Sequence, residues 1–235
     1  MLSIIIPTLN EAPQLRDTLA ALCALQQRGH EVIVVDGGSS DHTQSIAREF
    51  ANQVVDSARG RARQMNAGAA LARGNVLLFL HADTRLPEHA DVLIADALFQ
   101  GKTSWGRFDV RLSGEHFLLR IVESLMNRRS RLSSIATGDQ AIFVRREVFN
   151  QLGGYADIPL MEDIALCKSL KRLALPANLS ARVVTSSRRW EQRGIMRTIL
   201  LMWRMRLAYA LGASPHRLAQ VYQQKPACNS PPRAF

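Results

Sequence analysis

Short apolar segments alternate with longer amphipathic ones throughout the first 100 residues, and this alternation narrows the fold more than any other property of the sequence. Short apolar runs bounded by turn residues are typical of buried strands, whereas a 3.6-residue period indicates a helix. The order of segments predicts an α/β fold in which a mostly parallel central sheet carries helices on both faces. The predicted strands are Leu2–Ile6, Glu31–Val35, Val54–Val55 and Val76–Leu80, and the predicted helices are Pro13–Gln27, Asp41–Phe50 and Ala62–Leu71.

Polar residues gather directly after three of these strands, following Ile6, Val35 and Leu80. Open parallel sheets bind their ligands at the carboxyl ends of the strands. The three clusters therefore predict a nucleotide site at that edge of the sheet.

The second half of the chain is less regular and predicts a small antiparallel part. Thr103–Leu112 alternates like an antiparallel strand, Gln140–Val144 is a further apolar strand, and Glu115–Met126 and Glu162–Leu173 are helical. Gly153 begins a turn. Because no repeat or linker divides the chain, we predict one domain over residues 1–225, with a basic helical segment at about 192–223. Residues 226–235 are rich in Pro, Ser and Asn and are predicted to be a disordered tail.

Basic charge is concentrated at the end of the chain. Residues 1–170 hold 18 Lys and Arg against 19 Asp and Glu, whereas residues 171–235 hold 12 against 1. Such a field attracts the phosphates of a nucleotide, a nucleic acid or an anionic lipid, and charge alone does not choose among them.

The sequence favours a cytoplasmic protein. Its first residues, Met1 to Ile6, have no charged region and indicate a strand rather than a signal peptide. The apolar run Val76–Leu80 is too short to span a membrane. Cys23, Cys167 and Cys228 are too widely spaced to suggest a zinc pair or a disulfide framework.

A basic apolar helix is predicted over Ile195–Leu211. Arg197, Arg204 and Arg206 disfavour a membrane-spanning role for it. Two alternatives remain: the helix packs its apolar side onto the domain, or it lies with Trp203 on a membrane surface. The second alternative predicts a protein that is peripheral on the inner membrane.

Asp36 ends the second predicted strand and is followed by Gly37 and Gly38, which let a ligand approach the backbone. Its carboxylate can accept hydrogen bonds from a base or from ribose hydroxyls. A turn followed by a helix cap explains Asp41 equally well and Asp36 less well. The dinucleotide pattern G-x-G-x-x-G is absent from this segment.

His81 and Asp83 follow the strand Val76–Leu80 and project to the same side if that strand continues. A carboxylate at this position can hold a divalent cation that bridges a diphosphate. A polar strand end without function is the other interpretation. Imidazole binds Mg²⁺ poorly and Mn²⁺ acceptably, so His81 is either a metal ligand or a direct contact of the nucleotide phosphates.

Glu162 and Asp163 begin a predicted helix, where acids favour the helix dipole without any catalytic role. Two basic clusters, at 59–63 and 188–189, suit phosphate binding because arginine forks match phosphate oxygens. Trp190 can stack over such a site. Solvated surface charge is the usual explanation of a single cluster of this kind.

Taken in order, these segments resemble the family 2 glycosyltransferases, which have the GT-A fold. The resemblance extends from Ser3 to about Trp190. It rests on Ile4-Ile5-Ile6-Pro7-Thr8-Leu9-Asn10-Glu11, Val35-Asp36-Gly37-Gly38-Ser39-Ser40-Asp41, Asn66-Ala67-Gly68, Phe79-Leu80-His81-Ala82-Asp83-Thr84, Gly153-Gly154-Tyr155 and Glu162-Asp163. The His-Ala-Asp form and the segment Ser187-Arg188-Arg189-Trp190 resemble a bacterial subgroup associated with radical-SAM and selenium-domain proteins.

The resemblance implies a role for each matched residue. Asp83 matches the last acid of the family's D-x-D metal motif, and Asp163 matches its catalytic base, with Glu162 beside it. Arg188 and Arg189 would bind the diphosphate of the donor. The residues implied in nucleotide binding are Pro7, Thr8, Asn10, Glu11, Asp36, Arg63 and His81.

This chain departs from the family pattern at one position, because His81 replaces the first acid of D-x-D. The resemblance thus implies a divalent cation, Mn²⁺ or Mg²⁺, without fixing which. It also implies transfer of a sugar, with inversion, from a UDP- or GDP-sugar to an unknown acceptor, for which a lipid-linked molecule is one candidate. The rival functions are a sugar-nucleotide-forming nucleotidyltransferase and a basic nucleic-acid-binding module. A G-x-G-x-R-type loop, which the nucleotidyltransferase requires, does not follow Ile6.

Overall fold

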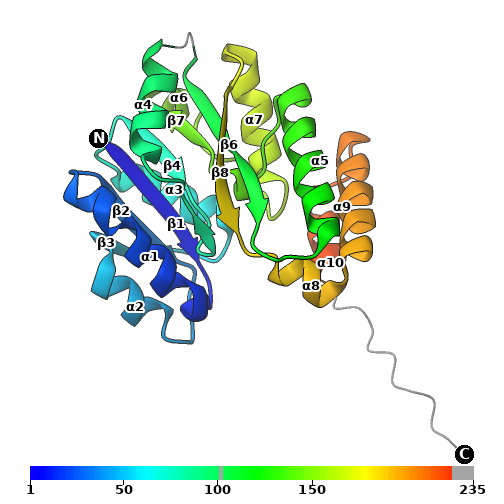
Figure 1. Cartoon of the computed structure of the whole chain (residues 1–235), viewed down its shortest axis with the longest axis horizontal. Coiled ribbons are helices and arrows are strands. Elements are labelled where there is room, and N and C mark those ends of the chain that lie inside the picture. Colours follow the sequence, from blue (N-terminus) through cyan, green and yellow to red (C-terminus); the bar gives the residue numbers. More distant parts are fainter. Residues whose placement is uncertain (101–102, 224–235) are drawn as a thin grey trace, which may run out of the picture.

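The computed structural model describes residues 1–100 and 103–223 and contains an eight-stranded mixed sheet in the order β3-β2-β1-β4-β7-β6-β8-β5 (Figure 1). The α/β class predicted from the sequence is confirmed. The strands are β1 Leu2–Thr8, β2 Glu31–Asp36, β3 Gln53–Asp56, β4 Val76–Phe79, β5 Thr84–Arg85, β6 Trp105–Leu112, β7 Phe143–Arg145 and β8 Ala177–Thr185. The helices are α1 Ala12–Gln27, α2 Thr43–Phe50, α3 Arg61–Leu71, α4 Ala90–Gln100, α5 Phe117–Ser133, α6 Arg146–Gln151, α7 Glu162–Leu173, α8 Arg188–Arg193, α9 Ile195–Ala210 and α10 Pro215–Gln223.

Strands β1 to β4 pair in parallel, and β7 joins the sheet antiparallel to β4 and β6. The strand predicted to be antiparallel, β6, is antiparallel to β7 but parallel to β8 over most of its length. All six residues of β2 are buried, as expected for a strand covered on both faces. Alignment of β1, β2 and β4 brings their carboxyl ends, and the polar residues that follow them, to one edge of the sheet.

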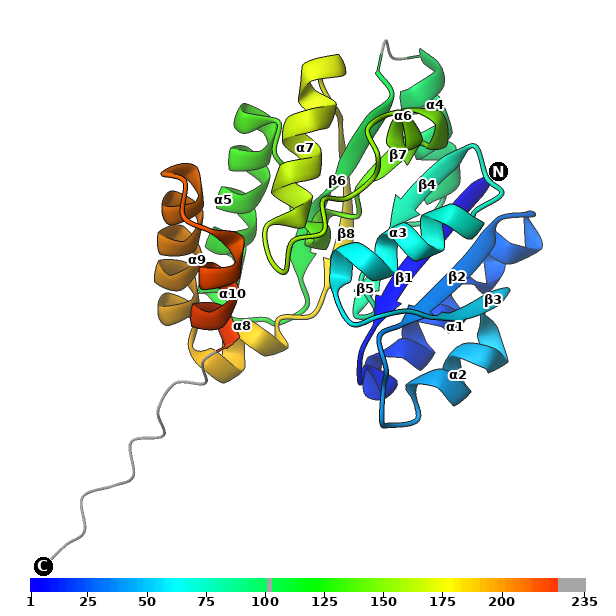
Figure 2. The same ribbon diagram turned by 180° about the vertical axis from the view of Figure 1, so that it is seen from behind.

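Two helical layers cover the sheet because alternate residues of each strand point to opposite faces. Ile4 and Ile6 pack with α1, α2 and α4 on one face (Figure 1). Ile5 packs with α3, α6 and α7 on the other face (Figure 2). Helix α4 is also held to α1 by Asp91, whose carboxylate accepts from Arg28 at 2.8 Å and contacts His30 at 3.0 Å.

Helices α5, α8, α9 and α10 form one end of the molecule beside β6 and β8 (Figure 2). Leu112 of β6 packs with Leu119 of α5 and Ile195 of α9, and a second cluster joins Met205 of α9 to Leu218 of α10. None of the helices in residues 1–100 and 103–223 is long and apolar enough to cross a bilayer.

Several boundaries differ from the sequence predictions. The strand expected at Gln140–Val144 begins later, at Phe143, because a 3₁₀ turn occupies Gly138–Gln140. The helix expected at Glu115–Met126 continues to Ser133. The predicted basic segment 192–223 comprises the end of α8 together with α9 and α10. The tail expected at 226–235 lies outside the described residues.

Candidate functional site

A cavity of about 540 Å³ opens at the carboxyl edge of the sheet. Its walls come from the end of β1, the segment after β4, the turn before β7, the start of α7, the end of β8, helices α8 and α9, and Tyr222 of α10. Segments predicted separately from the sequence, at 81–83, 162–163 and 188–189, all line this one cavity.

Asp163 lies in the first turn of α7, which begins after Met161 at a left-handed backbone angle of φ 69°. Its carboxylate accepts hydrogen bonds from the backbone N–H of Gly138 at 2.9 Å and of Ile164 at 2.7 Å. Burial and the charge of Glu162 raise the pKa of Asp163 to about 6, against the opposing effects of the Gly138 N–H and Arg61. A carboxyl group with this pKa changes its protonation state near neutral pH.

Glu162 is buried and forms an ion pair with Arg61, with 3.3 Å between Arg61 Nη1 and Glu162 Oε1. Arg61 is the first residue of α3 and also lines the cavity. The pair joins the start of α7 to the start of α3, so Glu162 positions the turn that carries Asp163.

His81 and Asp83 both line the cavity, although β4 ends at Phe79 and the strand does not continue to them as their predicted common side required. The Nδ1 atom of His81 lies 3.2 Å from Oδ1 of Asp139, in the 3₁₀ turn before β7. Burial raises the pKa of Asp139, but the hydrogen bond and charge of His81 outweigh it and lower this pKa to about 2. The backbone carbonyl of Asp83 accepts from the N–H of Ser186, which fixes this segment against the end of β8.

Asp36 is buried at the end of β2, and its carboxylate organises the loop that follows. It accepts from the N–H groups of Gly38 and Ser39 at 3.0 and 2.7 Å and from Thr8 Oγ1 at 3.2 Å. Burial raises the pKa of Asp36, but hydrogen bonds from the side chains of Ser39 and Gln44 and from the N–H groups of Ser39 and Gly38 outweigh it and lower the pKa. Asn10, at φ 55°, is bound to the same loop through Ser39 Oγ. The Asp36 carboxylate, like Thr8 and Asn10, lies outside the cavity lining.

Pro7 and Glu11 of the implied nucleotide residues line the cavity together with His81. Arg63 lies outside the lining and pairs on the surface with Asp157, with 2.9 Å between Nε and Oδ1. A nucleotide contact of Arg63 remains a prediction.

Arg188 and Arg189 begin α8 and line the cavity opposite Glu11. Arg188 Nη2 lies 3.5 Å from Glu11 Oε2. Burial and the charge of Asp83 raise the pKa of Glu11, whereas Arg188 lowers it, and the net shift is upward. The Arg189 guanidinium donates to Tyr222 Oη and stacks over the Tyr222 ring, so α10 closes this side of the cavity.

Five acids line the cavity, and three of them form ion pairs: Glu11 with Arg188, Asp139 with His81, and Glu162 with Arg61. Asp83 and Asp163 form no ion pair with any residue that the structure describes. Asp83 and Asp163, to which the family resemblance gives the metal and base roles, are thus the cavity acids without an ion pair among the described residues.

Sequence reasoning missed Arg61, Asp139, Arg206 and Tyr222 as cavity residues. Asp139 had a signal, because it lies in a polar segment directly before an apolar strand. Arg61 belongs to a cluster that the sequence marked as basic, although Arg63 was chosen from it. Arg206 and Tyr222 had no signal beyond the basic character of the C-terminal segment.

No three His, Cys, Asp or Glu side chains within residues 1–100 and 103–223 are grouped so as to hold a metal ion by themselves. A site completed by substrate is compatible with this arrangement, because Mg²⁺ is commonly held by one or two carboxylates plus substrate phosphates. Asp83, free of ion pairs among the described residues, fits such a site.

The sequence is similar to those of known glycosyltransferases. A "PGL/p-HBAD biosynthesis glycosyltransferase" of Mycobacterium bovis is 36% identical over 168 residues, which cover 66% of this chain and 63% of the relative. The "Probable glycosyltransferase YdaM" of Bacillus subtilis is 26% identical over 89% of this chain and 54% of its own length. The chain thus spans less than two thirds of either relative. Neither description names the radical-SAM-associated subgroup, so that narrower assignment remains a prediction.

Solved structures share the fold. The S. aureus TarS fragment 1–349 in complex with UDP has a TM-score of 0.65 at 18% identity, covering 79% of this chain and 60% of TarS. The mannosyltransferase PcManGT from Pyrobaculum calidifontis, in complex with GDP-Man and Mn²⁺, has a TM-score of 0.64 at 21% identity, covering 95% of this chain and 65% of its own. At these identities the likeness establishes the fold alone.

A sequence model described as "Glycosyl transferase family 2" matches residues 3–153, which include β1 to β4, the Asp36 loop and the His81–Asp83 segment. The match covers more than half of the chain. The chain therefore belongs to glycosyl transferase family 2.

Proposed function

We propose that this protein transfers a sugar from a nucleoside-diphosphate sugar to an acceptor hydroxyl, in a single displacement that inverts the anomeric carbon. The observation that carries the proposal is the pairing of charges in the cavity. Three of its acids are neutralised by cations from other segments, whereas Asp83 and Asp163 stay without an ion pair among the described residues. The family match favours this function over nucleotidyl transfer and over nucleic-acid binding.

Asp163 is the proposed general base. It takes the proton from the acceptor hydroxyl as that oxygen bonds to the anomeric carbon, and the bond from that carbon to the diphosphate breaks. A base works best when its pKa lies near the operating pH, and the pKa of about 6 places Asp163 in that range. The N–H groups of Gly138 and Ile164 fix the orientation of its carboxylate.

Arg188 and Arg189 are proposed to bind the departing diphosphate. The diphosphate takes the electron pair of the broken bond, so negative charge grows on its oxygens as the reaction proceeds. Fixed cations that face this charge stabilise the transition state more than the ground state. Glu11 holds Arg188 at the cavity wall, and Tyr222 holds Arg189.

Asp83 would hold a divalent cation, Mn²⁺ or Mg²⁺, together with oxygens of the donor diphosphate. Such a cation supplies charge neutralisation on the leaving group. PcManGT, whose complex contains Mn²⁺ and GDP-Man, supports this assignment by analogy of fold. The donor is proposed to be a UDP- or GDP-sugar, since the TarS complex contains UDP. The nucleoside would lie against Pro7 and the loops that Asp36 organises, with Thr8, Asn10, Glu11, Arg63 and His81 contributing.

The proposal is tested by thermal unfolding with UDP, GDP, CDP, TDP and their sugars, each with and without Mn²⁺ or Mg²⁺. A ligand that binds the native state alone raises the melting temperature. We expect one nucleotide to do so in a metal-dependent manner, and Asp83→Ala to abolish the metal dependence. Asp96→Ala, which alters an exposed acid of α4 outside the cavity lining, is the matched control.

Turnover of the identified donor then separates binding from chemistry. Asp163→Asn should keep the thermal shift and lose nearly all transfer. Normal turnover by this variant would refute the base assignment, and a lack of any nucleotide shift in the unmodified protein would refute the donor class.

A further inference from the structure

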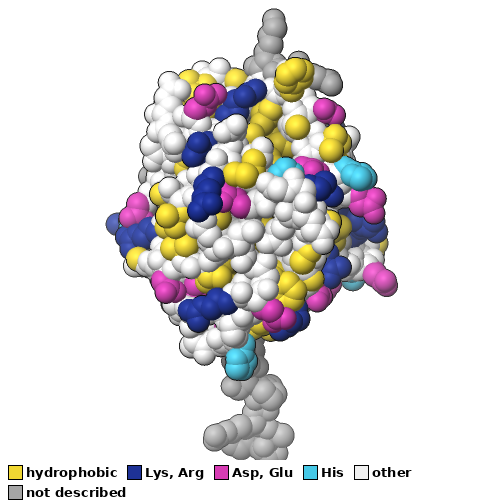
Figure 3. All heavy atoms as spheres, turned by 90° about the vertical axis from the view of Figure 1, so that its left-hand side faces the viewer, with side chains coloured by type: hydrophobic (Ala, Val, Ile, Leu, Met, Phe, Trp, Pro, Cys, Tyr) yellow, Lys and Arg dark blue, Asp and Glu magenta, His cyan; other side chains and the backbone are white. Residues whose placement is uncertain are grey.

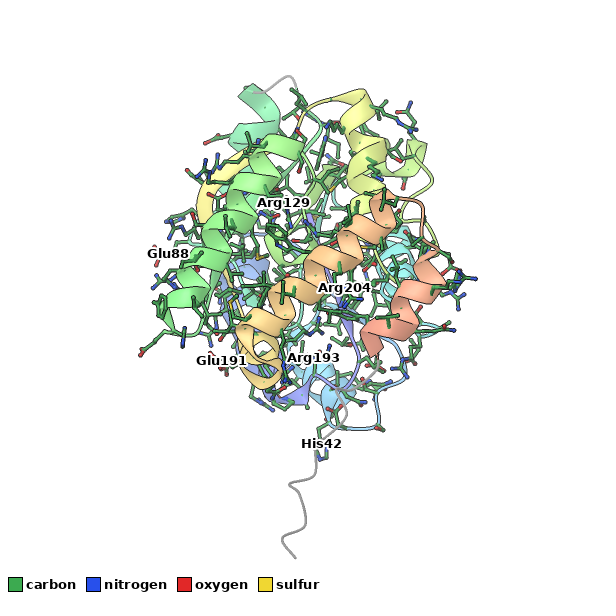
Figure 4. All side chains as sticks on the ribbon, turned by 90° about the vertical axis from the view of Figure 1, so that its right-hand side faces the viewer. His42, Glu88, Arg129, Glu191, Arg193 and Arg204 are labelled. Carbon is green, nitrogen blue, oxygen red and sulfur yellow. The ribbon has the colours of Figure 1, made fainter. Side chains whose placement is uncertain are left out.

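Helices α5 and α9 lie side by side at the end of the molecule that faces the viewer in Figure 4. They pack through Leu119 and Val122 of α5 and Ile195 and Ile199 of α9. This seam buries one apolar side of each helix, and each helix carries a second apolar side that points away from the protein.

The exposed apolar residues of α5 are four or seven positions apart and those of α9 are three or four apart, spacings that place each set on one face of its helix. In α9, Leu200, Trp203 and Leu207 are 61%, 67% and 62% exposed. Monomeric soluble proteins seldom expose so many large apolar side chains on one contiguous surface, and such patches mark interaction sites. We call this surface the α5–α9 face; it comprises Phe117, Ile121, Leu125, Leu132, Met196, Leu200, Trp203 and Leu207.

The exposed charges within α5 and α9 are all positive. Arg128, Arg197 and Arg204 are exposed on the same two helices, and Figure 4 labels Arg204 on α9. The single acid within α5 and α9 is Glu123, which is buried and accepts from the backbone N–H of Leu112 at 3.0 Å. The opposite side of the molecule shows Lys and Arg interspersed with Asp and Glu (Figure 3).

Helix α9 separates this face from the cavity. Thr198, Met202 and Arg206 line the cavity, whereas Leu200 and Trp203 belong to the exposed side. Neighbouring positions on a helix are rotated by about 100°, so Thr198 and Leu200 point in nearly opposite directions. One side of α9 thus packs onto the domain, as the first alternative predicted, and the other side is exposed.

We propose that the α5–α9 face docks this protein onto a membrane surface containing anionic lipids. Apolar side chains flanked by arginines, with a tryptophan among them, are the composition of helices that lie in the bilayer interface. The arginines match anionic headgroups, and the leucines and Trp203 match the acyl boundary. A second copy of this chain fits less well, because a symmetric contact would bring together two faces whose exposed charges within α5 and α9 are all positive.

Docking in this manner brings the cavity to within about one helix diameter, roughly 10 Å, of the lipid headgroups. That position favours an acceptor carried by a lipid, an inference that rests on the proposed sugar transfer. The docking itself does not depend on that reaction and can be tested without it.

The test is flotation of the full chain with vesicles of phosphatidylcholine and phosphatidylglycerol in equal parts, compared with vesicles of phosphatidylcholine alone. Binding is expected to the anionic vesicles. Leu200→Ser with Leu207→Ser should weaken it by about tenfold for each leucine. Arg197→Glu with Arg204→Glu should weaken it by at least about fivefold for each arginine.

Matched controls lie outside the α5–α9 face. Leu175 is 67% exposed and Arg172 is exposed, so Leu175→Ser and Arg172→Glu remove the same kinds of side chain elsewhere and should leave flotation unchanged. The emission of Trp203 should shift to shorter wavelength on addition of anionic vesicles, and Trp203→Phe should remove most of that shift.

Two results would overturn the proposal. One is the absence of flotation, or flotation that the variants of the α5–α9 face do not weaken. The other is a dimer in light scattering that Leu200→Ser with Leu207→Ser dissociates, since this would assign the face to a second copy. Nucleotide-induced thermal shifts should be the same in these variants, so a failure of docking is distinguishable from a failure of the proposed donor binding.

Discussion

Acidification should inactivate the proposed reaction through Asp163 well above the pH at which an ordinary aspartate protonates. Its pKa is raised from 3.8 to about 6 by burial and by Glu162. The pH dependence of kcat/KM reports the free enzyme, so about nine tenths of Asp163 is in the base form at pH 7 and about one tenth at pH 5. We therefore expect kcat/KM to fall about tenfold between these values. An aspartate with a pKa of 3.8 would lose less than a tenth of its rate.

The neighbours of Asp163 allow a test of the direction in which each of them shifts its pKa. Glu162 raises its pKa and Arg61 lowers it. Glu162→Gln should move the acid limb of the kcat/KM profile to lower pH, and Arg61→Gln should move it to higher pH. Both variants also alter the cavity wall and can change the maximal kcat/KM. The quantity to compare is therefore the pH at which kcat/KM falls to half of its maximum in each variant. A limb near pH 4 in the unmodified enzyme, or shifts of equal sign in the two variants, would contradict the reasoning.

The raised pKa of Asp163 also makes the free energy of unfolding depend on pH. Because the folded pKa of Asp163 lies above the unfolded value, its contribution is fully present below about pH 4 and is lost as pH rises through about 6. This carboxyl alone should lower the free energy of unfolding by at most about 3 kcal/mol across that range. Urea denaturation of the unmodified protein and of Asp163→Asn at pH 4.5 and 7 measures the difference, an assay for which no substrate is needed.

Three further predictions concern the framework of the site. Gly138→Ala places a Cβ against His81 Nε2, so it should sharply reduce turnover while the far-ultraviolet circular dichroism stays unchanged. Gly68→Ala puts a Cβ 2.6 Å from a β1 side chain and should destabilise the fold by about 2 kcal/mol in urea, whereas a serine at exposed Ala70 should have little effect. Burial raises the pKa of Asp91, but hydrogen bonds from Arg28 and His30 and the charge of Arg28 outweigh it and lower the pKa. Asp91→Asn should therefore destabilise the protein by about 2 kcal/mol at pH 7 and by less as pH falls below 3.8.

The first half of the fold could be predicted because its signals are local. Strands β1 and β2 are continuous apolar runs, and helix α1 between them buries leucines three or four positions apart. Strand β8, at Ala177–Thr185, was not predicted, because most of its side chains are only partly buried and no apolar run marks it. It is held by pairing with β6, some 70 residues earlier, where the register shifts between Phe108 and Asp109. A pairing partner so distant along the chain cannot be identified from a single sequence.

The basic cluster at 59–63 gives an example from the candidate site of what a single sequence does not reveal. Arg61 and Arg63 are two positions apart on α3 and so point about 200° away from one another. Arg61 lines the cavity and Arg63 meets Asp157 on the surface. The sequence marked the cluster as basic but did not show which arginine faces inward, because that depends on how α3 is rotated against the sheet.

His81, which stands where the D-x-D motif has its first acid, pairs with Asp139. An aspartate at position 81 would bring a second carboxylate toward Asp139, whose own oxygen lies 3.2 Å from the imidazole. Two close carboxylates in a buried site repel each other and tend to retain a proton unless a cation separates them. Histidine satisfies Asp139 within the protein and leaves Asp83 as the carboxylate at this edge available to a cation bound with the donor. On this argument, metal dependence should be carried by Asp83 and appear together with nucleotide, because the site lacks its phosphate ligands until the donor binds.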